Sequence, residues 1–430
     1  MQLDTRLRST FMRVMASRRF QALRHGGARV RRRLSREAPR VHYFHELSDP
    51  YSHLAVQQLD ALRARYALPF DVHLVSSAED VYRGDAARYG TWAMEDAAAI
   101  AAGYGVSFPD SAVAPGASTT RAAERELAPL LAEDAFASRA VELGERLWQG
   151  LVEPSSTDAL PEVVVQGNGL RARLGHYAGA MFYFDGEWYW GLDRLFHLEE
   201  RLVEEGYGSG PILVPRPRPS QTVADAGDVT LEYFPSLRSP YTAISFARTM
   251  DLVDRTGIKL VTRPVMPMMM RGVAAPAAKA SYIMFDAARE GRAADDEFGR
   301  IVDPFGEPVR RAFSLLPFLQ ANNKVREFTG RYLEAAWKQG VDITLNAGLE
   351  RIVRECDLDW QQALASMDND QWEPLLESNV SDMLALGLWG VPSFRVSSQH
   401  AAPFSAWGQD RLWRVEQAIC DHHLASNASG

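Results

Sequence analysis

The chain has 430 residues, of which 46% are hydrophobic and 24% are charged. That composition describes a globular protein long enough to bury two cores. No apolar run reaches the roughly 18 residues of a membrane span, and the N-terminal residues lack the apolar stretch of a secretory signal, so we expect a cytoplasmic protein without membrane spans. The two cysteines lie far apart and the ten histidines give no His-x-x-x-His pattern, so we expect no metal site.

The formal net charge of −8 hides an asymmetry. Residues 1–40 carry 12 Arg and two acids, which leaves 35 basic against 53 acidic residues in the remainder. Such an arm suits an anionic surface or an organellar targeting peptide, but it can equally be a mobile or loosely helical extension against the acidic body, which we favour. Its basic residues do not alternate with aromatics as in a nucleic-acid platform, so we expect no nucleic-acid partner.

Two similar series of elements are predicted along the chain. The first comprises a strand at 41–44, a helix after 52 with Ala55, Leu59 and Leu62 on one face, a strand at 70–75, helices over about 79–150, a strand pair within 178–190 and a helix opening at 191–195. Residues 208–227 are rich in proline, as in a linker. The second comprises a strand at 229–234, a helix from Pro240 with Phe246, Met250 and Val253 on one face, a strand at 258–265, a helical region over about 276–380 and a strand entered through 390–394.

Short sequences match in pairs between the two series. Asp49-Pro-Tyr51 matches Ser239-Pro-Tyr241, Met94–Ala98 matches Met284–Ala288, Trp148 matches Trp337, and Trp190–Leu195 matches Trp407–Leu412. We therefore predict a tandem duplication of one α/β unit, with a longer helical insertion in the second copy. The predicted domains are a basic extension at 1–40, a first domain at 41–207, the linker at 208–227 and a second domain at 228–425.

Ser239 stands directly before Pro240, where a helix is predicted to begin. Proline suits the first turn of a helix, which puts Ser239 at the N-cap, beside free amides and the positive end of the helix dipole. Such a position can hold an anion, including a thiolate. The same residues also describe a plain helix cap, and this stretch alone leaves both interpretations open.

The order of elements is the plan of a thioredoxin fold, and Ser239–Thr242 occupies the place where DsbA-type oxidoreductases carry Cys-Pro-x-Cys. Residues 228–420 resemble more closely the 2-hydroxychromene-2-carboxylate isomerases and kappa-class glutathione transferases. The matching motifs are Ser239-Pro-Tyr241, Gly390-Val-Pro392, Gly408-Gln-Asp-Arg411, and Lys279, Tyr282 and Asp286 in a Lys-x-x-Tyr-x-x-x-Asp helix. The predicted fold class is thus α/β, with two tandem thioredoxin-like (DsbA-type) domains, each with a helical insertion.

The resemblance implies glutathione as the cofactor. Ser239 would donate a hydrogen bond to the glutathione sulfur, and Val391, before a cis Pro392, would pair its backbone with the cysteine of the tripeptide. Gln409 and Asp410 would hold the γ-glutamyl end. Pro392 can equally serve the fold alone, and Asp410 can be a helix cap or a partner of Arg411.

Four further residues are candidates for a substrate pocket: Arg238, Tyr241, Met268 and Lys279. The Met266–Met270 run can line an apolar pocket or fill a core. Arg238 can favour a thiolate or face solvent, and we expect Lys279 to be a solvated helix charge rather than a catalytic group. The asparagine that the family carries after the second strand has no match in Met268–Arg271.

The first copy departs further, with Asp49 in the place of the serine and Ala180 in the place of the cis-proline. We expect it to keep the fold and to have lost the site. The predicted function is that of a glutathione-dependent isomerase or transferase acting on a small conjugated electrophile. The alternative is a non-catalytic binding or scaffold protein. Thiol–disulfide exchange is disfavoured because Ser239 and Thr242 replace the cysteines. Single-unit family members are typically dimers, so an internal pseudo-dimer or a homodimer is expected.

Overall fold

The computed structural model describes residues 3–429, which form two compact units. The first unit comprises residues 22–218 together with 275–279. The second comprises residues 219–274, the chain from Ala280 onward, and the N-terminal residues through Gln21. Each unit holds its own β-sheet.

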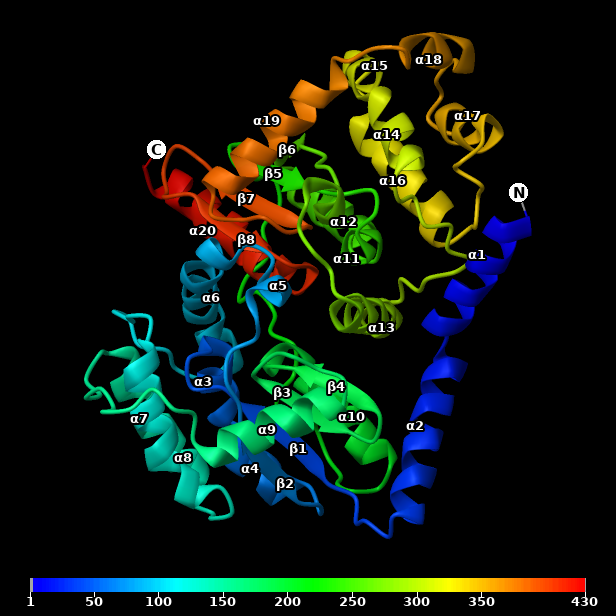
Figure 1. The fold of residues 1–430 in the computed structure, drawn as a ribbon. Helices are drawn as coiled ribbons and strands as arrows, with labels where there is room; N and C mark the ends of the chain where they lie inside the picture. The colour runs from blue at the N-terminus through cyan, green and yellow to red at the C-terminus, as the bar shows by residue number, and fades with distance from the viewer. Residues whose placement is uncertain (1–2, 430) are drawn as a thin grey trace. The chain divides into compact units, whose positions relative to one another are not determined.

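The elements that precede residue 219 are helices and shorter strands (Figure 1). They are α1 (Leu3–Ala16), α2 (Arg18–Leu34), β1 (Val41–His45), α3 (Pro50–Val56), α4 (Leu59–Arg65), β2 (Phe70–Leu74), α5 (Asp80–Arg83), α6 (Ala86–Ala101), α7 (Ala117–Leu127), α8 (Phe136–Trp148), α9 (Glu162–Arg173), β3 (Met181–Phe184), β4 (Glu187–Trp190) and α10 (Leu195–Glu204), with 3-10 turns at Ala102–Tyr104, Ala128–Leu130 and Leu192–Arg194.

The elements after residue 219 repeat this order with more helices between the second and third strands. They are β5 (Thr230–Phe234), α11 (Pro240–Ala243), α12 (Phe246–Thr256), β6 (Lys259–Thr262), α13 (Ala277–Ala293), α14 (Glu307–Ser314), α15 (Leu316–Ala321), α16 (Val325–Trp337), α17 (Asn346–Arg354), α18 (Trp360–Ser366), α19 (Trp372–Ala385), β7 (Ser393–Ser397), β8 (Phe404–Trp407) and α20 (Leu412–Ser429), with 3-10 turns at Met268–Arg271 and Gln409–Arg411.

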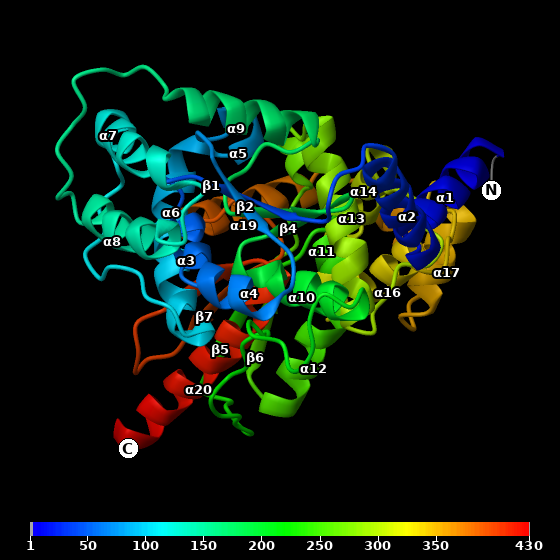
Figure 2. The ribbon, with the colours of Figure 1, turned by 90° about the horizontal axis from the view of Figure 1, so that it is seen from below.

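The two sheets have the same topology. The strand order is β2-β1-β3-β4 in the first and β6-β5-β7-β8 in the second, with one parallel pair in each and the other pairs antiparallel. Helices cover the sheets: α9 packs on β2 in the first unit, and α20 packs on β7 and β8 in the second (Figure 2). The predicted fold class, two thioredoxin-like α/β halves with helical insertions, is confirmed.

Matching contacts within each unit support the duplication independently of the sheets. The Tyr51 hydroxyl donates to the Asp96 carboxylate at 2.7 Å, and the Tyr241 hydroxyl donates to Asp286 at 2.8 Å. Both pairs span 45 positions. In each copy this bond ties the start of the first helix to the first long helix of the insertion.

The helix predicted from Pro240 through Val253 is divided into two. Helix α11 ends at Ala243, and α12 begins at Phe246. The Ser245 hydroxyl donates to the Tyr241 carbonyl at 2.7 Å, which is the kind of side-chain bond that bends a helix. The helix dipole behind Ser239 is therefore confined to a single short turn.

Strand β6 is shorter than the 258–265 predicted, because it ends at Thr262. Pro264 and Pro267 follow, and proline cannot donate to a strand ladder. The strand lies at the edge of its sheet.

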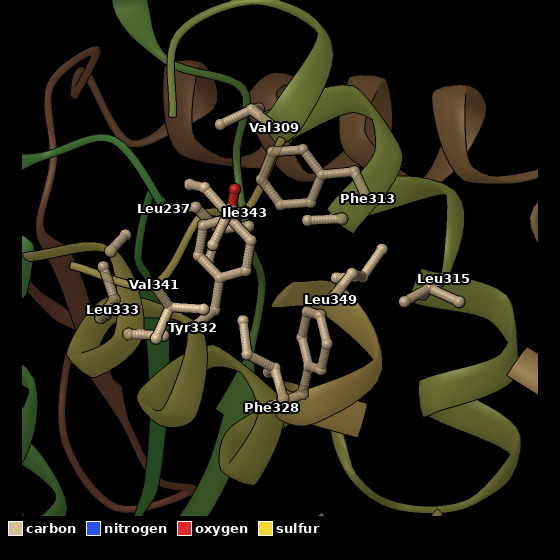
Figure 3. Close-up of a cluster of buried hydrophobic side chains, with 14 of the residues drawn as sticks. Leu237, Val309, Phe313, Leu315, Phe328, Tyr332, Leu333, Val341, Ile343 and Leu349 are labelled. Atoms are coloured by element: carbon tan, nitrogen blue, oxygen red, sulfur yellow. The ribbon is translucent and has the colours of Figure 1, made fainter. Parts of the chain in front are cut away.

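Two apolar clusters form the core of the second unit. One fills the sheet and includes Tyr233 and Phe394, whose rings stack 5.3 Å apart. The other, which we call the insert core, lies among α14–α18 and is built of large side chains (Figure 3), namely Val309, Phe313, Leu315, Phe328, Tyr332, Leu333, Val341, Ile343 and Leu349. Leu237, from the loop after β5, belongs to the insert core, so the insertion packs directly on that loop.

The Arg-rich arm forms the two helices α1 and α2. The Arg32 guanidinium pairs with Asp185 at 2.9 Å and Arg29 pairs with Glu205 at 2.8 Å, so α2 lies on acidic side chains of the first unit. The arm is thus helical and packed against acids, as favoured from the sequence. Among residues 3–429, no helix combines the length and apolarity needed to cross a membrane.

Gly390 offers a direct test of this packing. A Cβ atom at this position would lie 2.0 Å from the Trp407 indole. We therefore expect Gly390→Ala to lower the free energy of unfolding by about 3 kcal/mol through overpacking. Urea unfolding followed by circular dichroism measures the change.

Gly90 in α6 provides the matched control, since a Cβ there would meet nothing within 4 Å. Gly90→Ala should leave stability unchanged or raise it by up to about 1 kcal/mol. Equal effects of the two substitutions would contradict the close Gly390–Trp407 contact.

Candidate functional site

The loop between β5 and α11, residues 235–239, is fixed from two directions. The Val265 amide, after β6, donates to the Pro235 carbonyl at 2.9 Å. The Trp337 indole, at the end of α16, donates to the Leu237 carbonyl at 3.2 Å. The segment after β6 and the insertion therefore hold the residues that present Ser239.

Ser239 is the N-cap of α11, as predicted. Its Oγ accepts a hydrogen bond from the Thr242 amide at 3.1 Å, and its hydroxyl donates to the Val391 carbonyl at 3.3 Å. The second distance is longer than the roughly 2.7–2.8 Å usual for O–H···O bonds, so the proton is held weakly. The residue is 8% exposed, which places the hydroxyl beneath the surface.

The second part of the site is the loop of residues 389–392 before β7. The Val391–Pro392 peptide bond is cis, as the sequence predicted. The Gly408 amide donates to the Pro392 carbonyl at 2.9 Å. Within residues 3–429 the Val391 amide finds no backbone acceptor. The structure thus brings together Ser239, Val391 and Pro392, which lie about 150 positions apart in the chain.

Arg271 also holds the Val391–Pro392 loop, and sequence reasoning missed it. Its guanidinium donates to the Trp389 carbonyl at 2.7 Å and to the Met266 carbonyl at 3.0 Å. Burial lowers the pKa of this guanidinium. Both acceptors are backbone atoms, so no residue pattern could have revealed the contact. Arg271 lies in the stretch where the family asparagine was sought.

Gln409 lies in the short turn Gln409–Arg411 after β8, and its side chain is engaged at both ends. Its Oε1 accepts from Arg248 at 2.7 Å, and its Nε2 donates to Glu290 at 2.6 Å. The residue is 2% exposed, so only its backbone is left to meet a ligand. The neighbouring Asp410 carboxylate lies 3.8 Å from the Arg411 guanidinium, with 18% of its side chain exposed.

The Arg238 side chain is paired with another residue and does not stand free to favour a thiolate at Ser239. Its guanidinium forms a bidentate pair with Asp303 at 2.8 and 2.9 Å and lies 4.6 Å from the centre of the Phe305 ring. The Asp303 carboxylate offsets its charge. Arg238 is therefore neither free in solvent nor an electrostatic partner of Ser239.

The other pocket candidates have separate environments. Tyr241 is half-buried and bonded to Asp286, which also accepts from Arg289 at 2.6 Å. Met268 is half-buried in a 3-10 turn, and its neighbours Met266 and Met270 pack against the insert core, as a core-filling role predicts.

Lys279 groups with the first unit rather than with Ser239. Its ammonium donates to the Tyr82 carbonyl at 2.8 Å, and burial lowers its pKa. The expectation of a solvated helix charge was wrong, because the ammonium is partly buried and bonded to a backbone carbonyl.

In the first unit, the positions equivalent to Ser239 and Pro392 hold the different residues Asp49 and Ala180. Asp49 caps α3 and accepts from the Ser52 amide at 3.1 Å and the Ser52 hydroxyl at 2.9 Å. The Ser52 oxygen in turn accepts from the Ala180 amide at 2.8 Å. The Gly191 amide donates to the Ala180 carbonyl at 2.7 Å, just as Gly408 donates to Pro392, so Ala180 does occupy the cis-proline place.

The Asp49 carboxyl group is buried beside a second acid, Glu46. Burial and the Glu46 charge raise the pKa of Asp49 to about 7, although its bonds to Ser52 and Tyr51 oppose the shift. A carboxylate here would repel a thiolate. Neither cysteine of the chain replaces the missing sulfur, since Cys356 and Cys420 are both buried and burial raises the pKa of the Cys356 thiol to about 12.

Comparison with known proteins gives one family match in the second half of the chain. Residues 230–420 match the family model described as DSBA-like thioredoxin domain. The match begins at β5 and ends within α20, so it includes Ser239 and the Val391–Pro392 loop. No curated protein matches the chain.

Several solved structures are similar to about half of the chain. 2-Hydroxychromene-2-carboxylate isomerase has 15% identity and a TM-score of 0.40 over 46% of this chain and 98% of its own. The disulfide reductase DsbM from Pseudomonas aeruginosa, solved with GSH, has 12% identity and a TM-score of 0.33 over 46% and 98%. A probable DsbA oxidoreductase from Streptomyces coelicolor has 12% identity and a TM-score of 0.35 over 45% and 89%. At these values we draw nothing about function from them.

The raised pKa of Asp49 predicts a pH-dependent stability. An unfolded aspartate ionises near pH 4, so the folded protein binds the extra proton between about pH 4 and about pH 7 and loses stability as the pH rises through that window. Asp49→Asn keeps a cap acceptor without the charge. It should raise the free energy of unfolding on the order of 2 kcal/mol at about pH 8, with the gain vanishing toward about pH 4.

Chemical denaturation at a series of pH values measures this difference. Asp110→Asn, at an exposed site, is the control and should change nothing. A gain from Asp49→Asn that is the same at all pH values would contradict the buried, proton-binding carboxyl group.

Proposed function

We propose that the second unit binds glutathione and uses its thiolate to attack a small conjugated electrophile, as a glutathione-dependent isomerase or transferase. The observation that carries this is the meeting of the Ser239 hydroxyl with the Val391 carbonyl at 3.3 Å, at the end of the sheet where the cap of α11 faces the Val391–Pro392 loop. A sulfur seated at this junction would be within reach of the Ser239 proton.

The hydrogen bonding of Ser239 suits a sulfur acceptor. A hydroxyl has one proton and two lone pairs. One lone pair is taken by the Thr242 amide, which fixes the oxygen at the start of α11. The proton is held only by the long bond to the Val391 carbonyl, so a thiolate can replace that carbonyl as the acceptor.

The free energy of a hydrogen bond from Ser239 to the sulfur is large enough to lower the pKa of the glutathione thiol. Lowering a thiol pKa by about two units corresponds to about 2.7 kcal/mol of preference for the thiolate. A hydrogen bond to a charged group contributes about 1.5–3 kcal/mol. The Ser239 hydroxyl can therefore supply most of the shift that keeps glutathione ionised at neutral pH.

The rest of the tripeptide would bind to backbone amides of the second unit and to the Asp410 carboxylate. The Val391 amide, which has no backbone acceptor within residues 3–429, would pair with the cysteine carbonyl of glutathione. Asp410 would attract the ammonium of the γ-glutamyl end, and the amides at the start of the Gln409–Arg411 turn would meet its carboxylate. The Gln409 side chain would stay with Arg248 and Glu290.

The proposed reaction requires no oxidant. The thiolate adds to the electron-poor carbon of a conjugated system, forming a C–S bond while the electron pair moves to the activating carbonyl oxygen. The former double bond is then single and can rotate. Return of the electron pair expels the thiolate and leaves an isomer, whereas protonation of the adduct leaves a glutathione conjugate.

A second candidate is a non-catalytic thioredoxin-fold binding or scaffold protein. Two observations favour it: Ser239 is 8% exposed, and the Gln409 side chain is committed to protein partners. In that case the cap and the Val391–Pro392 loop would serve the fold alone. An internal pseudo-dimer or a homodimer belongs to either proposal, and light scattering tests it.

Ser239→Ala tests the enzyme directly. The substitution removes the proton offered to the sulfur, so glutathione-dependent turnover of a chromophoric conjugated enone should fall about 100-fold, which corresponds to about 2.7 kcal/mol. Loss of the helix cap should lower the free energy of unfolding by only about 1 kcal/mol. Turnover is followed by absorbance, and stability by urea unfolding.

Ser236→Ala is the matched control, because Ser236 is buried in the same loop and its hydroxyl has no partner within the described part of the chain. It should leave turnover unchanged. Equal turnover in the wild type and Ser239→Ala would remove the proposed role of Ser239.

Calorimetric titration of glutathione separates the two candidates. The enzyme should bind glutathione with measurable heat, more weakly at low pH where the thiolate is protonated. A scaffold protein need show no heat at all. Absence of binding in the intact wild type would favour the scaffold.

A further inference from the structure

Helix α2 presents three large apolar side chains to solvent, while Phe20, in its first turn, stacks on Phe285 with ring centres 6.2 Å apart. Leu23, Val30 and Leu34 are 72%, 56% and 80% exposed, and no residue of the helix is buried. Their spacing of seven and four residues puts them on one face. This stripe runs along the outside of a helix whose other face is polar.

The polar face of α2 is the one that contacts the first unit. The Arg24 guanidinium donates to the Gly186 carbonyl at 2.7 Å, His25 meets Glu187 at 2.5 Å, and Arg32 meets Asp185 at 2.9 Å. The helix is thus attached through charge, and its amphipathic pattern is the reverse of that of a helix covering a core.

Helix α1 shows the same arrangement on the second unit. Leu7, Phe11 and Val14 are 63%, 61% and 50% exposed, at a spacing of four and three residues. On its opposite face, Ala16 and Met12 pack against the insert core. Two successive helices therefore each turn an apolar stripe outward.

Arginines flank both stripes. In α2, Arg31 and Arg33 are exposed on either side of the stripe by helical periodicity, and in α1 Arg6, Arg8 and Arg13 are exposed. Residues 1–40 hold only two acids, while the rest of the chain carries a net charge of −18. An apolar centre with basic flanks fits a surface that is apolar beneath and negatively charged at its edge, as in an anionic bilayer.

We propose that α2 docks the protein peripherally on an anionic phospholipid bilayer, and that α1, on the other unit, offers a separate contact of the same kind. The apolar stripes would enter the boundary between headgroups and acyl chains, and the flanking arginines would pair with lipid phosphates. The inference does not depend on the glutathione proposal, because it uses none of the residues of that site.

Charge argues against the other occupants of these faces. A second copy related by twofold symmetry would bring one Arg-flanked stripe against another and repel it. A nucleic acid would engage the arginines but leave five of the six large apolar side chains in water, since Phe11 is the one stripe residue that can stack on a base.

Flotation with vesicles tests the full-length protein. It should bind vesicles of phosphatidylcholine mixed with phosphatidylglycerol and float with them, and it should stay behind with phosphatidylcholine alone. Raising the salt concentration should weaken the binding, since salt screens the arginines.

Two variants separate the apolar and charged contributions. Leu23→Ser/Val30→Ser/Leu34→Ser should weaken vesicle affinity at least about 100-fold, because three exposed side chains lose their apolar contact. Arg31→Gln/Arg33→Gln should weaken it about 25-fold, given about fivefold for each basic residue near the surface. All five side chains are exposed, so circular dichroism should show an unchanged fold.

Matched control variants replace similar side chains elsewhere. Val113→Ser/Leu151→Ser/Val165→Ser removes three exposed apolar side chains of the first unit, and Arg173→Gln/Arg331→Gln removes two exposed arginines. Both controls should bind vesicles like the wild type.

Four results would overturn the proposal: no binding to anionic vesicles, equal binding to neutral ones, no effect of the α2 variants, or control variants that weaken binding as much. Self-association abolished by the apolar variant would assign the stripes to a second copy. Binding of nucleic acid that survives the apolar variant, without vesicle binding, would assign the arginines to a polyanion.

Discussion

The antiparallel pairing of β5 with β7 is the constraint on which the candidate site depends. Phe234 lies opposite Ser393, so the loop that follows one strand and the loop that precedes the other meet at the same end of the sheet. That register places the two loops side by side, with Ser239 and Val391 within hydrogen-bonding distance. A slip of one residue would also turn the buried Tyr233 and Phe394 out of the core, which strongly opposes any other register.

The first unit shows how far the fold and the chemistry are separable. Its β1–β3 pairing brings Ser52 and Ala180 together in the same way, and the Tyr51–Asp96 bond repeats that of Tyr241 and Asp286. Yet its cap is a buried carboxyl group beside Glu46. The scaffold thus tolerates an acid where the second unit offers a hydroxyl, because backbone amides at the start of a helix donate equally well to a carboxylate or a hydroxyl oxygen.

Most of the fold could be predicted from local patterns in the sequence. Alternating apolar residues predicted the strands, and the paired motifs predicted the duplication. The cap position of Ser239 and the cis Val391–Pro392 bond were predicted from short motifs whose residues are consecutive in the sequence. The side-chain partners could not be predicted, because they depend on packing between distant elements. Arg271 binds carbonyls, and Arg238 finds Asp303 some 65 positions away. The Gln409 side chain is hydrogen-bonded to Arg248 and Glu290, each more than 100 positions away in the sequence.

One indole joins the insertion to the loop that carries Ser239. Trp337 ends α16 and donates to the Leu237 carbonyl, while the Leu237 side chain is embedded among the residues of the insert core. The insertion can therefore diverge in length and sequence along its outer helices and still leave the loop in register, provided that this junction is kept. This junction is the place to join the parts of a chimaera. A foreign insertion would need its own hydrogen-bond donor at the end of a helix, in the position of Trp337, to bind the Leu237 carbonyl.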